Sequence, residues 1–148
     1  MRVFLVRHAE ACSVLEDPER PLTPAGREAA GRLAQWCLDH GVAPQQIRHS
    51  GVLRAAQTAE ILAARLAPEG GVRAVRGLAP DDDPVPVAED LTHETRVLML
   101  VTHLPFVGEL ASLLLTGSDR LALKFSTGTI ACIGLDASGF RLDATFTP

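Results

Sequence analysis

Two segments of the chain are continuously apolar. They are residues 3–6, Val-Phe-Leu-Val, and residues 97–101, Val-Leu-Met-Leu-Val. A strand with one exposed face alternates apolar and polar side chains, whereas a strand inside a parallel sheet is covered on both faces and is apolar throughout. We therefore predict two central strands of a parallel sheet, over residues 3–6 and 96–102.

Apolar residues at helical spacing follow these strands. Thr23, with a proline directly after it, has the pattern of an N-cap followed by proline at the first helical position, which predicts a helix over about residues 24–40. A second amphipathic helix is predicted over residues 52–66 and another begins at Pro105. Strands and helices therefore alternate along the chain.

Shorter elements complete the pattern. Residues 46–50 and 72–76 are strand candidates, and residues 86–93 form a short helix candidate. Residues 129–135 and 140–146 flank a turn, and apolar and polar side chains alternate in the second segment, as in an antiparallel hairpin with one solvent-facing side. The expected fold is one three-layer α/β/α domain with a mostly parallel central sheet and a C-terminal antiparallel hairpin.

Composition and charge limit the binding partners and the cellular compartment that we expect for this protein. The net charge is -4 and no block of basic residues occurs, so we expect no nucleic-acid partner. The longest apolar stretches fall far short of the ~18 residues of a membrane span, so we expect no membrane partner. The widely spaced Cys12, Cys37 and Cys132 argue against a disulfide framework and a structural zinc site. We expect a cytoplasmic protein.

Candidate chemistry lies where predicted strands end. In open α/β sheets, ligands bind beyond the carboxyl ends of the strands. A lone histidine there is most simply packed or exposed at the surface, and a lone arginine is most simply paired with a carboxylate. A group of both residue types, however, provides the side chains of an anion-binding site with a nucleophile. Four such residues follow three predicted strands: Arg7, His8, Arg54 and His103.

Four ordered segments that contain these residues resemble the histidine phosphatase superfamily, the group that includes phosphoglycerate mutases. The segments are residues 3–10 (Val-Phe-Leu-Val-Arg-His-Ala-Glu), residues 20–23 (Arg-Pro-Leu-Thr) with Gly26, residues 50–59 (Ser-Gly-Val-Leu-Arg-Ala-Ala-Gln-Thr-Ala) and residues 101–108 (Val-Thr-His-Leu-Pro-Phe-Val-Gly). The short chain is most similar to the small bacterial phosphohistidine phosphatases. The resemblance implies one histidine phosphatase domain over residues 1–148, without large cap insertions.

Two positions depart from the pattern of the family. Ala9 stands where the family usually has glycine, and Gly51 stands where it usually has proline. Only a positive φ would demand glycine, so we expect a negative φ at Ala9.

The resemblance implies a metal-independent phosphatase that needs no cofactor and forms a covalent phosphohistidine intermediate. His8 is then the nucleophile, and Arg7 and Arg54 are catalytic cations. His103 donates to a phosphoryl oxygen, with its protonated form adding positive charge as the transition state develops, and Arg20 binds substrate. Arginine suits these positions because its planar fork forms paired bonds to phosphate oxygens. The implied substrate is phosphohistidine in a protein of the histidine-phosphotransfer type used in signal transduction, or a small phosphorylated molecule.

The sequence leaves the leaving-group acid open. Mutase-like members place a carboxylic acid after the third strand, where this chain has aspartates at positions 81–83. Prolines flank this segment, which favours a solvated turn over a proton donor. Glu10 and Asp17 are weaker candidates.

Rival functions also remain. One is a general small-molecule phosphomonoesterase, and another is a catalytically silent phosphate-binding or scaffold module. A metal site made of His8, Glu10 and His103 is disfavoured because the neighbouring Arg7 and Arg54 would repel a cation.

Overall fold

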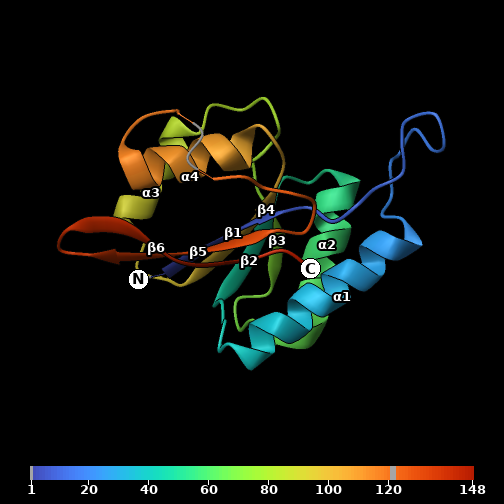
Figure 1. Ribbon diagram of the computed structural model, residues 1–148, viewed down its shortest axis with the longest axis horizontal. Coiled ribbons are helices and arrows are strands. Elements are labelled where there is room, and N and C mark those ends of the chain that lie inside the picture. Colours follow the sequence, from blue (N-terminus) through green and yellow to red (C-terminus); the bar gives the residue numbers. More distant parts are fainter. Residues whose placement is uncertain (1, 121–122) are drawn as a thin grey trace.

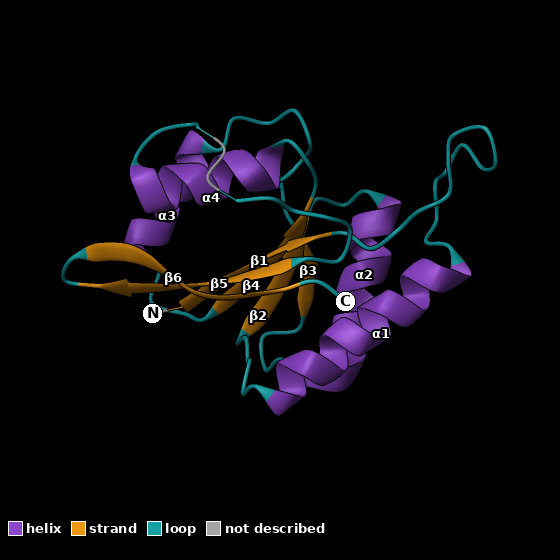
Figure 2. Ribbon diagram, in the orientation of Figure 1, coloured by secondary structure: helices purple, strands orange, loops and turns teal. Residues whose placement is uncertain are grey.

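The computed structural model describes residues 2–120 and 123–148, which form a mixed six-stranded sheet between two layers of helices (Figures 1 and 2). The elements in chain order are β1 (Arg2–Arg7), α1 (Pro24–Asp39), β2 (Gln46–His49), α2 (Leu53–Leu66), β3 (Val72–Ala74), α3 (Val85–His93), β4 (Leu98–Thr102), α4 (Phe106–Thr116), β5 (Ile130–Asp136) and β6 (Gly139–Phe146). The expected α/β/α fold is confirmed. No helix in the described part of the chain has the length and apolar character needed to cross a membrane.

The strands follow the order β3-β2-β4-β1-β5-β6. Strands β1 to β4 are parallel, whereas β5 pairs antiparallel with β1, and β6 pairs antiparallel with β5. Helices α1 and α2 cover one face of the sheet, and α3 and α4 cover the other (Figure 1). The sheet is thus mostly parallel with a C-terminal antiparallel hairpin, as the sequence predicts.

The two continuously apolar strands lie next to each other inside the sheet. β1 and β4 pair in parallel, with Val3 opposite Leu98 and Arg7 opposite Thr102. Val3 and Leu5 pack into the core beneath α3 and α4, and their neighbours in β1 pack into the core beneath α1 and α2. Burial on both faces explains why neither strand alternates.

Helix α1 begins as its sequence predicts and approaches the preceding loop closely. The Thr23 Oγ1 atom accepts a hydrogen bond from the Gly26 backbone N–H at 2.9 Å, and Pro24 is the first helical residue. A Cβ atom on Gly26 would lie 2.0 Å from the backbone oxygen of Glu10. Glycine is therefore required here so that α1 can pack against the chain leaving β1.

The terminal hairpin differs from the prediction of one solvent-facing side. The register between β5 and β6 shifts by one residue, because Cys132 pairs with Ala144 and Ile133 pairs with Leu142. Asp143 is left as an extra residue in β6. Such a bulge moves the alternating side chains from one face of the sheet to the other. Phe140 accordingly packs towards α3 and α4, whereas Phe146 stacks on Trp36 of α1 with ring centroids 4.9 Å apart.

Two glycines of α1 provide a matched test of this packing. We expect Gly26→Ala to lower the free energy of unfolding by about 1–3 kcal/mol, because the added methyl group overlaps the Glu10 carbonyl. Gly31→Ala should raise it by about 0.5–1 kcal/mol, because no heavy atom lies within 4 Å of its added Cβ and alanine favours the helix. Urea unfolding measures both. Equal effects of the two substitutions would contradict the close approach at Gly26.

Candidate active site

The pairing of β1 with β4 brings two histidines together that are far apart in the sequence. The His8 backbone N–H donates to the Thr102 carbonyl at 2.9 Å, and His103 follows Thr102 directly. The His8 and His103 rings have centroids 5.1 Å apart. Both side chains are buried, with 6% and 1% exposure. The predicted nucleophile and its partner therefore lie side by side beyond the carboxyl ends of the strands.

Two hydrogen bonds fix the tautomer of His8. Its Nδ1 atom lies 2.7 Å from the Ala9 carbonyl oxygen, and Arg54 Nε donates to its Nε2 atom at 3.3 Å. A carbonyl only accepts and a guanidinium only donates, so the proton of the neutral ring is on Nδ1 and the lone pair is on Nε2. This is the tautomer that a nucleophilic Nε2 requires.

The two departures from the family pattern have different structural consequences. Ala9 does not have a positive φ, which occurs outside glycine only at Arg20 and Ala67 in the described residues. Alanine is therefore acceptable at this position, and its carbonyl lies 2.7 Å from His8 Nδ1. Gly51 has a φ of 88°, which a proline could not adopt. The turn after β2 therefore has a conformation that depends on glycine.

Burial and nearby charge keep both histidines neutral at pH 7. Burial lowers the pKa of His8 to about 4; the bond to Ala9 opposes this shift, and the charges of nearby arginines add to it. Burial also lowers the pKa of His103 to about 3, with further lowering by His8 and by the arginines. His103 is therefore neutral in the free protein, and its protonation as a transition state develops stays a prediction.

The predicted arginines converge on His8 from three segments. Arg7 ends β1, Arg54 lies in the first turn of α2, and Arg20 lies in the loop before α1. The charges of Arg54, Arg7 and Arg20 each lower the pKa of His8. A site that disfavours a protonated histidine in this way favours an anion, since the same positive potential attracts negative charge.

Some N–H donors of this site bond to backbone carbonyls, whereas others are buried without an acceptor in the described residues. Arg7 Nη1 donates to the Phe125 carbonyl at 3.0 Å, and Arg20 Nε donates to the Cys12 carbonyl at 2.9 Å. Arg7 Nε and His103 Nδ1 are buried and have no hydrogen-bond partner within the described part of the chain. Buried polar groups are normally paired, and phosphoryl oxygens would pair with N–H donors at both positions.

Ser50 contacts a candidate site residue, and the sequence assigned it no role. Its Oγ atom accepts from the Val52 backbone N–H at 3.2 Å and lies 2.6 Å from His103 Nε2. When the hydroxyl donates to Nε2, the ring proton of His103 is on Nδ1, which is then a donor. The position of Ser50 directly after β2, inside a quoted motif, was the available signal.

The aspartates at positions 81–83 form a turn. Asp82 Oδ2 accepts from the Ala79 backbone N–H at 2.8 Å, and Asp83 Oδ1 accepts from the Val85 backbone N–H at 3.0 Å. Asp81 is exposed. These local bonds agree with the predicted solvated turn.

The weaker acid candidates also bond locally. Glu10 Oε1 accepts from Thr23 Oγ1 at 2.8 Å, and Asp17 Oδ1 accepts from the Glu19 backbone N–H at 2.9 Å.

Across residues 2–120 and 123–148, no three His, Cys, Asp or Glu side chains form a group able to hold a metal ion.

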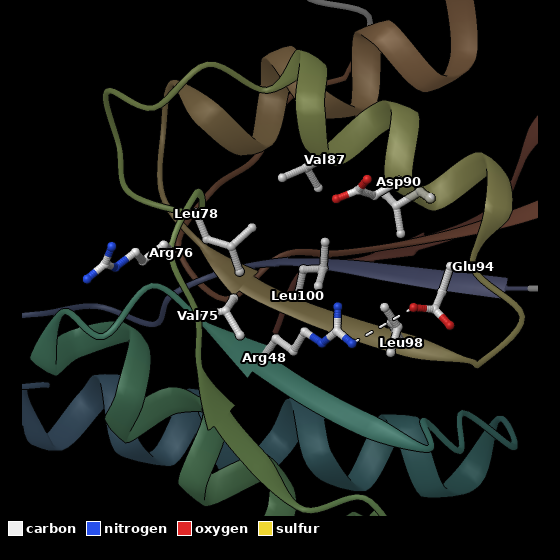
Figure 3. Close-up of a pocket in the computed structure, with 10 residues that line it drawn as sticks. Arg48, Val75, Arg76, Leu78, Val87, Asp90, Glu94, Leu98 and Leu100 are labelled. Carbon is white, nitrogen blue, oxygen red and sulfur yellow. Dashed lines mark ion pairs between the residues drawn. The ribbon is translucent and has the colours of Figure 1, made fainter.

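A separate cavity of about 120 Å³ lies between the sheet and α3 (Figure 3). Leu98 and Leu100 of β4 form part of its wall, and Arg48 of β2 reaches across it to Glu94 at 3.8 Å. Glu94 pairs more closely with Arg96, at 2.9 Å, and this bond holds the pKa of Glu94 at about 2. None of the predicted phosphoryl-binding residues lines this cavity.

Comparison with known proteins identifies the family. Residues 3–78 match the family model of the histidine phosphatase superfamily (branch 1), and this segment contains four of the five predicted site residues. The chain belongs to the histidine phosphatase superfamily. The resemblance drawn from the sequence motifs is therefore confirmed.

Relatives of this histidine phosphatase include the phosphohistidine phosphatase SixA of Escherichia coli (strain K12). The two are 32% identical over 144 residues, which cover 94% of this chain and 88% of SixA. A solved structure of the protein histidine phosphatase SixA with tungstate has a TM-score of 0.87 at 29% identity, covering 99% of this chain and 97% of that one. A candidate SixA from Agrobacterium tumefaciens shares the fold, with a TM-score of 0.83 at 23% identity and coverage of 99% and 97%.

The depressed histidine pKa values predict a pH-dependent stability. Between pH 6.5 and about 4 the unfolded chain binds a proton at His8 that the folded protein does not, so the free energy of unfolding should fall as the pH is lowered through this window. We expect the decrease in the free energy of unfolding between pH 6.5 and pH 4 to be smaller in His8→Asn than in wild type, by on the order of 3 kcal/mol. Urea unfolding at several pH values measures it, with His40→Asn as the exposed control. Parallel pH profiles for wild type and His8→Asn would contradict the assignment.

Proposed function

We propose that this histidine phosphatase hydrolyses phosphohistidine in proteins, without a metal or cofactor, through a phosphoryl group held covalently on His8. The observation that carries the proposal is the neutral His8 ring, whose Nε2 lone pair faces Arg54 within a cluster of arginines. The similarity to SixA supports the substrate class. We further propose that residues 1–148 form one catalytic domain without a large cap, and the free Cys12, Cys37 and Cys132 support a cytoplasmic setting.

In the first step, His8 Nε2 attacks the phosphorus atom while the phosphorus–nitrogen bond of the substrate breaks. Arg54 Nε, which donates to Nε2 in the free protein, moves its hydrogen bond to a phosphoryl oxygen. Arg7 and Arg20 neutralise the charge that spreads over the phosphoryl oxygens. The neutral His103 donates a further hydrogen bond, and a donor positioned in this way is worth about 3–4 kcal/mol of transition-state stabilisation.

In the second step, water attacks phosphorus and the bond to His8 Nε2 breaks. The electron pair returns to Nε2, and both water protons leave with the phosphate as dihydrogen phosphate. Throughout, the proton of His8 stays on Nδ1, which donates it in a hydrogen bond to the Ala9 carbonyl. This bond keeps the phosphorylated ring protonated, which makes the imidazole a good leaving group.

The leaving group explains why phosphohistidine suits a site without a positioned acid. An alkoxide is a strong base, and general acid catalysis of its departure is worth roughly 10² to 10⁴ in rate. Phosphohistidine that carries a proton on its distal ring nitrogen departs as neutral imidazole, whose conjugate acid has a pKa near 6.5. Asp82 and Asp83 are already bonded within their own turn, which agrees with a substrate that needs no enzyme acid.

The test of this function uses phosphoramidate, a small molecule with a phosphorus–nitrogen bond. Wild type should release phosphate and show a species heavier by one phosphoryl group in mass spectrometry after a non-acidic quench. We expect His8→Ala to lose both signals, because no other group occupies the Nε2 position, while His40→Ala, which changes an exposed histidine, keeps both. Full turnover by His8→Ala would refute the covalent route, and phosphate binding without turnover by wild type would favour the silent module.

A second prediction concerns substrate preference. Phosphohistidine and aryl phosphates should be hydrolysed at least about 10²-fold faster than sugar phosphates, since only the alkyl esters require a general acid. Changing the aspartates at positions 81–83 to asparagine should leave phosphohistidine turnover nearly intact. Initial rates measure both. Comparable rates on a sugar phosphate, lost in the triple variant, would instead identify a phosphomonoesterase with an acid in this turn.

A further inference from the structure

The loop between β1 and α1, residues 8–23, extends away from the body of the protein beside the phosphoryl site (Figure 1). Its tip displays two apolar side chains, Val14 with 61% exposure and Leu15 with 95% exposure. Leu15 is the most exposed large hydrophobic side chain in residues 2–120 and 123–148. We call this pair, Val14 and Leu15, the apolar tip.

The loop holds the apolar tip in place by its own hydrogen bonds. Ser13 and Glu16 bond reciprocally, each backbone N–H donating to the other's side chain at 3.2 Å. The Asp17 backbone N–H donates to the Ser13 carbonyl at 3.0 Å, and an Ala11–Leu22 bridge closes the base. A preorganised loop loses little conformational entropy on binding, so the exposed side chains are ready for a contact.

The apolar tip is joined directly to the anion site. Arg20, whose charge lowers the pKa of His8, belongs to the same loop. Its Nε atom donates to the Cys12 carbonyl at 2.9 Å. The tip therefore has a fixed position relative to the nucleophile. A protein that binds the tip is held in register with the site.

The geometry of a protein-borne phosphoryl group brings the substrate surface to this loop. His8 is only 6% exposed, so a phosphohistidine must enter the site to reach its Nε2 atom. Its tether is a single side chain, and the surrounding protein surface must therefore approach the carboxyl edge of the sheet closely. A loop that extends beyond that edge lies in the path of this surface (Figure 1).

The charge around the apolar tip defines the complementary surface. Residues 10–19 contain four carboxylates and no basic side chain, and Glu16 and Glu19 next to the tip are exposed. Opposite charges at an interface increase its association rate and its specificity. The fitting surface is therefore an apolar patch bordered by lysine or arginine.

We propose that Val14 and Leu15 dock the phosphohistidine-bearing protein through an apolar patch bordered by basic residues next to its phosphorylated histidine. This inference rests on the proposed function. It assigns protein recognition to the loop tip and phosphoryl transfer to the buried site. The two tasks are therefore separable by mutation.

The experiment compares two substrates: phosphoramidate and a histidine-phosphotransfer domain phosphorylated on its histidine. Leu15→Ser should lower kcat/KM for the phosphorylated domain about tenfold or more, mainly through KM, since a leucine buried in a contact contributes on that scale. Turnover of phosphoramidate should stay within about twofold of wild type, because Leu15 is 95% exposed at the tip of the loop. Leu15→Met should restore most of the loss.

Controls distinguish the apolar tip from general surface effects. Leu38→Ser changes another exposed leucine, near the end of α1, and should leave both substrates unaffected. Glu19→Lys should lower kcat/KM for the phosphorylated domain alone, because it would repel a basic border. Unchanged turnover of the phosphorylated domain by Leu15→Ser, or equal losses on both substrates, would overturn the docking role. Failure of the proposed function would appear differently, as absent turnover of both substrates by wild type.

Discussion

The parallel pairing of β1 with β4 is the constraint on which the site depends. It places Arg7 opposite Thr102, and the His8 backbone N–H donates to the Thr102 carbonyl, so His8, the proposed nucleophile, and His103 leave the sheet side by side. Thr102 Oγ1 in turn donates to the Leu78 carbonyl at 2.6 Å, which anchors the loop after β3 to the same edge. Apolar cores on both faces hold these strands, and their burial offsets the cost of gathering arginines around a buried histidine.

One set of positive charges serves two purposes in this site. Burial, and then the charges of the arginines, oppose protonation of His8, and the same charges would attract a phosphoryl group towards Nε2, the proposed nucleophile. The Ala9 carbonyl has a complementary effect because it retains the proton on Nδ1. Burial and charge alone would leave the tautomer undefined, and the hydrogen bonds of the Ala9 carbonyl and of Arg54 Nε define it together. An alanine at this position supplies the carbonyl as well as glycine would, since its φ is not positive.

Features carried by local pattern were predictable from the sequence, and features created by tertiary contacts were not. The apolar run at residues 3–6 and the N-cap at Thr23 identified their elements because burial on both faces and capping leave local signatures. The strand ends indicated which residues would gather at one edge of the sheet, because parallel strands share a carboxyl edge. The bulge at Asp143, the contact of Ser50 with His103 and the lowered pKa of His103 depend on packing between distant segments.

The central claim is that a neutral His8, protonated on Nδ1, presents its Nε2 lone pair among arginines. Nitrogen-15 NMR of the imidazole, with assignment by comparison to His8→Asn, tests this claim directly across a pH titration. We predict a pyrrole-type Nδ1 and a pyridine-type Nε2 from pH 7 down to about pH 5, with protonation only as the pH approaches about 4. A ring protonated on both nitrogens at pH 6, or a neutral ring with its proton on Nε2, would contradict the account.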